Sequence, residues 1–81
     1  MQVVAKFFAL YRQIAGADKV TVELPNGSTV AQLIDLLNKK FEKLDLDFRR
    51  TVVIVDRKKT TAATILKNGD EAFILQSMSG G

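Results

Sequence analysis

One amphipathic segment in the middle of the 81-residue chain constrains the fold more than any other feature. Its apolar residues recur at helical spacing, at Val30, Leu33, Ile34, Leu37 and Phe41. Thr29 is followed three residues later by Gln32, a capping box that marks where a helix begins. The pattern predicts a helix over residues 30–43, whose apolar stripe has to be covered by a second layer.

Two strand patterns precede this helix. Residues 3–8 and 19–24 alternate along their length, which is typical of half-buried strands, and we expect them to pair antiparallel. Between them, residues 9–15 are predicted to form a short helix. It ends at Gly16, because glycine suits the left-handed conformation of a helix C-cap.

Two further strand patterns follow the helix. Residues 52–55 are a continuous β-branched run, so both faces of that strand are apolar. Residues 71–76 are predicted to form the last strand. Between these two strands we expect a turn over residues 56–59, a short strand at 60–61 and one helical turn over 62–66.

The order strand–strand–helix–strand–strand predicts an α+β domain over residues 1–76. The fold that fits is the β-grasp, or ubiquitin-like, fold: a mixed sheet of four to five strands with one main helix packed on one face. The first and last strands of such a sheet lie side by side in its centre. We therefore expect residues 77–81 to leave the sheet as a flexible C-terminal tail that ends in Gly-Gly.

The sheet face opposite the helix is predicted to be unusually apolar. Phe8, alternate residues of 52–55 and alternate residues of 73–75 fall on it, where an isolated small domain normally exposes polar side chains. Scattered exposed apolar residues are common and are the alternative interpretation. The more specific hypothesis is a patch that docks a partner next to the tail.

The composition excludes several kinds of chemistry. The chain has no Cys and no His, which excludes a disulfide, a thiolate nucleophile, an ordinary zinc site and a His general base. We therefore expect a carrier or substrate that binds no permanent cofactor and no metal. No apolar run reaches membrane-spanning length, and no signal-peptide pattern opens the chain, so we expect a cytoplasmic protein.

The charge pattern gives no indication of nucleic-acid binding. The net charge is +3, with basic clusters at residues 39–40, 49–50 and 57–59. Aromatic side chains are not interleaved with these clusters, as a base-stacking platform requires. We interpret the clusters as solvated surface.

The C-terminal residues are the candidate site. Gly80 and Gly81 have no Cβ, so they can pass through a channel too narrow for side chains, and the carboxylate of Gly81 would be the one reactive group of the tail. Met78 and Ser79 complete the set of residues that we expect to enter a partner. A terminal Gly-Gly also occurs without any function, so this motif alone is weak.

Four motifs in register resemble one family. Residues 7–16, Phe-Phe-Ala-Leu-Tyr-Arg-Gln-Ile-Ala-Gly, resemble the opening signature of the small subunit of molybdopterin synthase. Residues 24–30 resemble that family's turn into its helix, residues 68–71 its turn before the last strand, and residues 79–81 its terminal Gly-Gly. The whole chain is therefore similar to the MoaD/ThiS-like ubiquitin-fold sulfur carriers, and most of all to that small subunit.

The resemblance implies a function for Gly81. In the family, an E1-like adenylating enzyme (MoeB-like) uses ATP to adenylate the terminal glycine, and sulfur then displaces AMP to leave a thiocarboxylate. The large subunit of molybdopterin synthase (MoaE-like) receives the tail, and the sulfur passes to the precursor of the molybdopterin dithiolene. A heterotetramer of the two subunits is implied.

The predicted partner contacts are Phe8, Leu75, Lys59 and Arg12. The family pattern favours Leu75 over Phe73 as the outward-facing residue of the last strand.

Three other functions would use the same chain. A sulfur carrier for thiamine or tRNA thiolation would share the tail chemistry and differ in the acceptor, although thiazole carriers are usually shorter and lack the opening signature. A ubiquitin-like protein modifier would join Gly81 to lysines of target proteins. A plain binding domain would have an idle tail.

Overall fold

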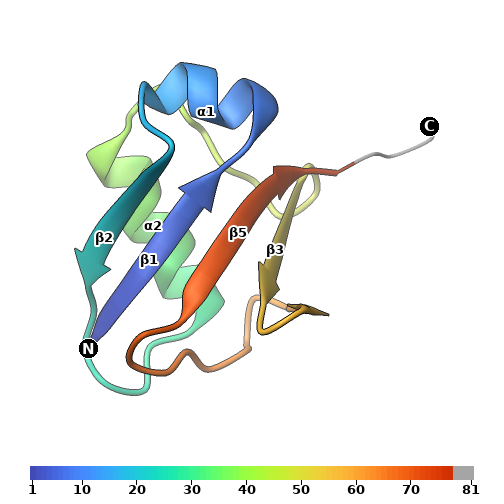
Figure 1. The fold of residues 1–81 in the computed structure, drawn as a ribbon. Helices are drawn as coiled ribbons and strands as arrows, with labels where there is room; N and C mark the ends of the chain where they lie inside the picture. The colour runs from blue at the N-terminus through green and yellow to red at the C-terminus, as the bar shows by residue number, and fades with distance from the viewer. Residues whose placement is uncertain (78–81) are drawn as a thin grey trace.

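A five-stranded mixed sheet and two helices make up residues 1–77, the part of the chain that this computed structural model describes (Figure 1). In chain order the elements are β1 (Gln2–Phe7), α1 (Ala9–Ala15), β2 (Lys19–Glu23), α2 (Val30–Lys40), β3 (Thr51–Val55), β4 (Lys58–Lys59) and β5 (Glu71–Gln76). The strand order is β2-β1-β5-β3-β4. β1 and β5 pair parallel and the other neighbours pair antiparallel. The predicted β-grasp arrangement, with the first and last strands adjacent, is confirmed.

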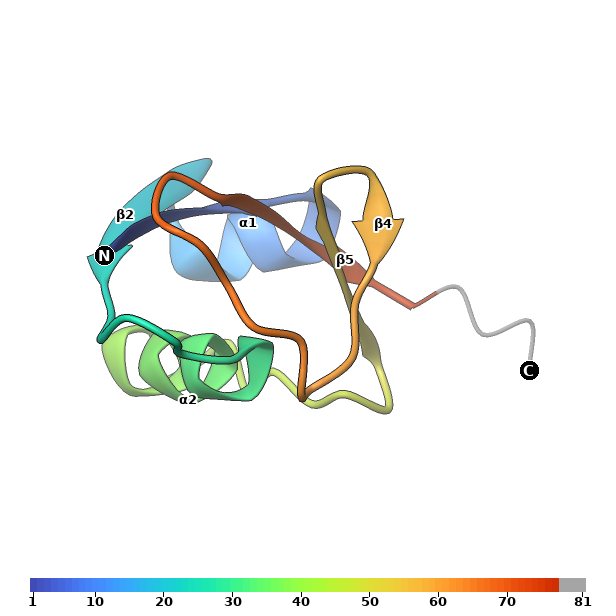
Figure 2. The same cartoon turned by 90° about the horizontal axis from the view of Figure 1, so that it is seen from below.

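α2 packs across one face of the sheet, and the hydrophobic core lies between these two layers (Figure 2). Side chains alternate along a strand, so every second residue of β1, β3 and β5 is buried. α2 contributes its apolar stripe, because helical spacing places those residues on one side. The core residues from these elements are at most 8% exposed: Val3, Ala5, Phe7, Val30, Leu33, Ile34, Leu37, Val53, Val55, Ala72 and Ile74.

β1 leads into α1 through Phe8, which has an extended conformation at the N-cap. α1 ends where the sequence predicts, at Gly16. The φ angle of Gly16 is +71°, and its N–H donates to the carbonyl of Arg12 at 3.0 Å. Glycine adopts this left-handed conformation without a steric penalty because it has no Cβ. Tyr11 is the buried residue of α1, so one side chain anchors this helix to the body.

α2 begins at the predicted capping box but ends earlier than predicted. The Thr29 side chain accepts from the N–H of Gln32, and the Gln32 side chain accepts from the N–H of Thr29. At the other end Phe41 leaves the helical conformation, with φ −123° and ψ 84°. Its ring packs edge-on against Phe7, with 5.5 Å between the ring centroids. This core contact overrides the helical pattern, so the prediction of helix over residues 41–43 is wrong.

Residues 62–66 form no helical turn, which contradicts the prediction. The segment lies against the start of α2 and accepts hydrogen bonds from its amides. Val30 N–H donates to the carbonyl of Thr64 at 2.9 Å, and Ala31 N–H donates to the carbonyl of Ala62 at 3.0 Å. The first amides of a helix have no partner within the helix, and here two of them donate to carbonyls of this segment instead.

The strand after β3 is β4, and not residues 60–61 as predicted. Asp56 and Arg57 make a two-residue turn in which both have positive φ, +53° and +64°. Two-residue turns of this kind match the twist of the strands that they join, so the chain reverses sooner than the sequence indicates. Thr60 only extends the pairing, by donating its N–H to the carbonyl of Val53 at 3.0 Å.

The positive φ of Arg57 predicts that Arg57→Gly raises the free energy of unfolding by about 0.5–1 kcal/mol. A residue with a Cβ is strained in the left-handed region, and this relief exceeds the entropy that glycine adds to the unfolded chain. Urea denaturation measures the change. Lys58→Gly is the matched control: it lies next to the turn, in β4, and should destabilise the protein. Equal destabilisation by both variants would contradict the prediction.

Candidate partner-docking surface

An apolar patch covers the sheet face opposite α2. We define the outer patch as the non-core apolar side chains of β3 and β5 together with the residue that follows β1: Val52, Ile54, Phe73, Leu75 and Phe8. Phe8 is 39% exposed and the other four are half-buried. Val52 pairs directly with Leu75, and Ile54 with Phe73, so the four strand residues share one face. The predicted apolar outer face is confirmed.

Leu75 faces outward, as the family pattern favours, but Phe73 faces outward too, so the prediction was wrong to treat the two residues as alternatives. The two residues are separated by one position in β5, and a strand has a side-chain period of two. Ile74, between them, is fully buried.

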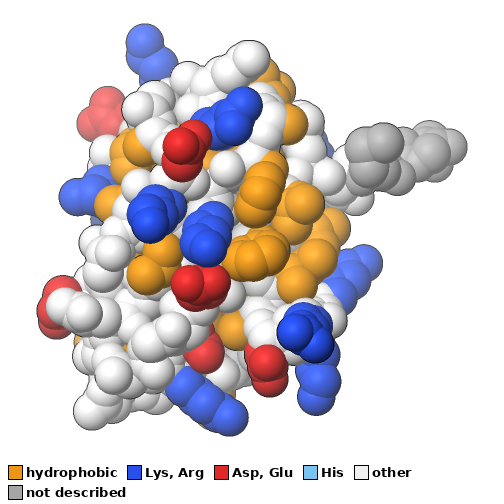
Figure 3. Space-filling view, in the orientation of Figure 1, with side chains coloured by type: hydrophobic (Ala, Val, Ile, Leu, Met, Phe, Trp, Pro, Cys, Tyr) orange, Lys and Arg blue, Asp and Glu red, His pale blue; other side chains and the backbone are white. Residues whose placement is uncertain are grey.

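Phe8 and Phe73 join the patch into one surface. Their ring centroids are 5.6 Å apart, and the Lys6 ammonium nitrogen lies 5.5 Å from the centroid of the Phe73 ring. Lys6 also pairs with Glu71, with 3.2 Å between Nζ and Oε1. Apolar side chains gather over β5 and β3, while charged side chains gather over β1 and β2 (Figure 3). The face therefore offers an apolar centre with a charged margin, the usual anatomy of a protein interface.

Lys59 lies at this margin. It is exposed and pairs directly with Ile54, so its side chain is on the face of the outer patch. Arg12 is on α1, one helical turn after Phe8: its N–H donates to the Phe8 carbonyl at 3.4 Å, and its Nε lies 3.8 Å from a carboxylate oxygen of Asp18. The structure thus brings Phe8, Leu75 and Lys59 to one face, and Arg12 follows Phe8 by one helical turn.

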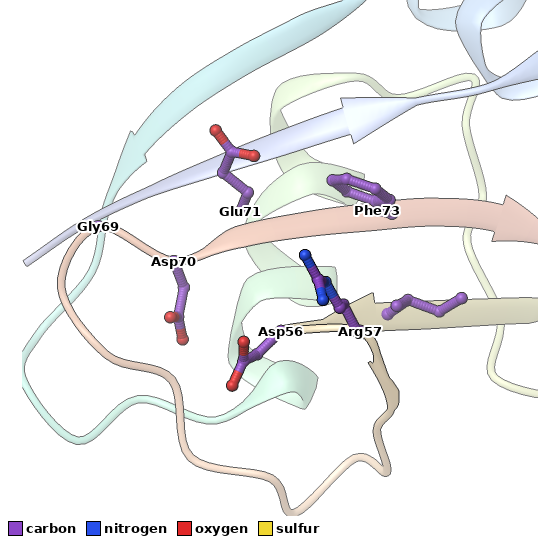
Figure 4. Close-up of a pocket in the computed structure, with 7 residues that line it drawn as sticks. Asp56, Arg57, Gly69, Asp70, Glu71 and Phe73 are labelled. Carbon is purple, nitrogen blue, oxygen red and sulfur yellow. The ribbon is translucent and has the colours of Figure 1, made fainter.

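A groove of about 420 Å³ extends the outer patch at the end of β5 that is far from Gln76. Its lining combines two patch residues with charged ones: Ile54, Phe73, Asp56, Arg57, Gly69, Asp70 and Glu71. The Arg57 guanidinium lies between the β3–β4 turn and β5, and the carboxylates of Asp56 and Asp70 point into the groove from its two sides (Figure 4). This charged extension is not predictable from the sequence, because it forms only when the β3–β4 turn lies beside the start of β5.

β5 carries the chain directly from the outer patch toward the predicted tail. Its last residue is Gln76, as predicted, and the ladder with β3 continues for one more residue: Ser77 N–H donates to the carbonyl of Arg50 at 2.8 Å. We call Ser77 the root of the tail. The other predicted tail residues, Met78, Ser79, Gly80 and Gly81, lie outside the described residues.

The loop before β3 holds its shape through one charged contact. Asp47 accepts from the backbone N–H of Arg49 at 2.9 Å and from its guanidinium at 2.9 Å. These hydrogen bonds stabilise the carboxylate, so they lower the pKa of Asp47 from 3.8 to about 2, chiefly through the Arg49 side chain. The pair is exposed at Arg49, so it sets local geometry more than overall stability.

Within residues 1–77, no three acidic side chains gather as a metal site would require. Neither of the helices in this part of the chain is long and apolar enough to cross a membrane. The described surface thus combines exposed apolar side chains and ion pairs with the end of β5, where the chain leaves the sheet.

Fold and surface together define a ubiquitin-like β-grasp protein whose central and C-terminal strands carry a partly exposed apolar face. The chain belongs to the ThiS family, whose model matches residues 5–81. It is 32% identical to the molybdopterin synthase sulfur carrier subunit of Arabidopsis thaliana over 74 residues, which cover 91% of this chain and 77% of the relative.

Solved structures agree with this assignment. A Pyrococcus furiosus protein named for subunit 1 of molybdopterin converting factor is 32% identical, with a TM-score of 0.82 over 91% of this chain and 94% of that one. SAMP1 of Haloferax volcanii is 21% identical with a TM-score of 0.88, and the match covers both chains fully. Subunits 1 and 2 of the Helicobacter pylori molybdopterin-converting factor have been solved as a complex, and that structure matches with a TM-score of 0.67 at 17% identity, with full coverage of both chains. The last two likenesses show the fold.

The lowered pKa of Asp47 predicts how stability depends on pH. The unfolded chain takes up a proton around pH 3.8 and the folded one around pH 2, so the stabilisation is complete above about pH 5 and is lost progressively as the pH falls through 2. Asp47→Asn should therefore flatten the fall in the urea midpoint between pH 4 and 2. Asp35→Asn, on α2, is the control and should retain the wild-type slope. An unchanged slope in Asp47→Asn would contradict the assignment.

Proposed function

We propose that this protein is a sulfur carrier, the small subunit of molybdopterin synthase, which carries sulfur on the C-terminal carboxylate of Gly81. The observation that carries the proposal is the 32% identity to a molybdopterin synthase sulfur carrier subunit over 91% of the chain. The geometry supports it, because β5 carries two residues of the outer patch and ends at Gln76, so a partner docked on the patch lies next to the point where the chain leaves the sheet.

The proposed cycle begins with activation of a poor electrophile. A carboxylate oxygen of Gly81 attacks the α-phosphorus of ATP and pyrophosphate leaves, which gives an acyl-adenylate. A hydrosulfide equivalent then attacks the carbonyl carbon, and AMP leaves with the electron pair of the broken C–O bond. The product is a thiocarboxylate. The thiocarboxylate sulfur then attacks a carbon of a pterin precursor of the molybdopterin dithiolene, and an oxygen leaving group departs from that carbon. Water attacks the carbonyl carbon of the resulting thioester, the C–S bond at Gly81 breaks, and the sulfur leaves as a thiolate on the pterin, which restores the carboxylate.

Partners supply the catalytic groups in this proposal. The chain has no Cys and no His, so sulfur comes from outside and the bases belong to other proteins. An E1-like adenylating enzyme would bind and use the ATP. The large subunit would receive the tail in its thiocarboxylate form. The solved complex of the two Helicobacter pylori subunits supports such a partner. Glycine suits entry into the active sites of both partners, since it presents no side chain near the reacting carbonyl.

Intact-mass analysis of the native protein tests the proposal. After incubation with the E1-like enzyme, ATP and a sulfur donor, the mass should rise by one oxygen-to-sulfur exchange located at Gly81. Deletion of Gly80 and Gly81 should abolish the exchange and shift the melting temperature very little, because two glycines contribute no side chain to the core.

Other outcomes separate the competing functions. Lysine-linked conjugates without the exchange would identify a protein modifier. Exchange followed by transfer to tRNA or a thiazole precursor would identify another sulfur pathway. A chain that stays unmodified and supports activity without its two glycines would rule out the carrier.

The outer patch predicts that Leu75→Lys weakens binding of the large subunit by about 2 kcal/mol, since a charge would be buried at the centre of an apolar contact. Folding of the free protein should change by less than about 1 kcal/mol, because Leu75 is only half-buried. Calorimetric titration and thermal unfolding measure the two effects. Phe8→Lys should behave in the same way.

Thr21→Lys is the matched control for these variants. It adds the same charge to the exposed side of β2, two strands away from β5. It should bind like the wild type. Loss of folding in Leu75→Lys, or equal loss of binding in Thr21→Lys, would show that the outer patch is not the docking surface.

A further inference from the structure

A buried hydroxyl on α1 reaches the root of the tail. Tyr11 is 6% exposed, and its Oη lies 3.2 Å from the carbonyl oxygen of Arg50 and 2.8 Å from Oγ1 of Thr51. That same Arg50 carbonyl accepts the N–H of Ser77 at 2.8 Å. Residues about forty positions apart therefore meet at the point where the chain passes beyond β5.

The hydrogen bonds are consistent with one continuous chain of donors. The N–H of Asp47 donates to Oγ1 of Thr51 at 3.4 Å. The Thr51 hydroxyl then donates to Tyr11, and the Tyr11 hydroxyl donates to the Arg50 carbonyl. The second lone pair of this carbonyl takes Ser77 N–H, and donors and acceptors in a linked chain strengthen one another. In this arrangement each hydroxyl both donates and accepts.

The hydrogen bonds connect α1 to the root of the tail, which suits a role in positioning the tail. Tyr11 is the buried residue of α1, so the contact that anchors this helix also ends on the carbonyl that holds Ser77. Neither Tyr11 nor Thr51 lines the groove that extends the outer patch. An effect on the tail is therefore distinguished from an effect on docking by measuring kcat and KM separately.

We infer that Tyr11 is a positioning residue for the C-terminal tail, acting with Thr51 through the Arg50 carbonyl to fix the direction in which the chain leaves β5 at Ser77. The inference rests on the proposed function, because a fixed exit matters only if the tail has to enter another protein's active site. Docking on the outer patch brings the partner to the surface, and the Tyr11 network then aims the chain at the channel. A tail direction that is fixed before binding raises the reaction rate within the bound complex more than it raises the affinity for the partner.

Tyr11→Phe tests the inference, since it removes the hydroxyl and keeps the packed ring. In the protein alone, the amide of Ser77 should exchange with solvent about three- to tenfold faster, the ratio expected for loss of one supporting hydrogen bond. In steady-state adenylation by the E1-like enzyme, kcat should fall about tenfold while KM for the carrier stays within about twofold of wild type. Thr51→Val should reproduce both effects.

Thr29→Ala is the matched control for stability. It removes the N-cap of α2, and so it should lower the melting temperature to a similar extent as Tyr11→Phe. It should leave both Ser77 exchange and kcat at wild-type values. A fall in kcat in Thr29→Ala equal to that in Tyr11→Phe would overturn the inference, because stability alone would then explain the effect.

The two proposals fail in different ways. A wild-type protein that is never adenylated overturns the proposed function, and the catalytic part of this inference with it. An adenylated wild type with an unchanged kcat in Tyr11→Phe overturns the positioning role alone. Unchanged Ser77 exchange in Tyr11→Phe shows that the hydroxyl does not hold the root of the tail.

Discussion

The parallel pairing of β1 with β5 is the constraint on which the rest of the structure depends. The register sets Lys6 opposite Phe73 and Phe7 opposite Ile74, so the start and the end of the chain run side by side through the centre of the sheet. Because the strands are parallel, Phe8 and Gln76 both emerge at the same end. One pairing thus places an exposed aromatic residue, the rest of the outer patch and the root of the tail on one side of the molecule.

The two faces of the central strands differ in what covers them. The inner face is closed by α2 and supplies the core, which an 81-residue chain without Cys needs in order to fold without disulfides. The outer face keeps apolar side chains partly exposed on β3 and β5, an arrangement that lowers solubility unless a partner covers it. Lys6 covers part of the Phe73 ring, so the exposed apolar area is smaller than the residue types indicate.

Most of the fold follows from local patterns. The alternation in β1 and β2, the capping box of α2 and Gly16 at the end of α1 were predicted because each depends on residues that are neighbours in the chain. The predictions went wrong where distant contacts decide. Phe41 leaves the helical conformation where its ring packs against Phe7, and the carbonyls of Ala62 and Thr64 accept hydrogen bonds from the first amides of α2.

The sequence by itself determined the fold class, the apolar character of the outer face and the chemistry that the chain lacks, because periodicity and composition are properties of the chain alone. Only the tertiary structure decided which residues meet. The charged groove beside Phe73 and the contact of Tyr11 with the Arg50 carbonyl join segments that are far apart in the sequence. No local pattern encodes such a meeting, since it depends on how the strands are ordered and in which register they pair.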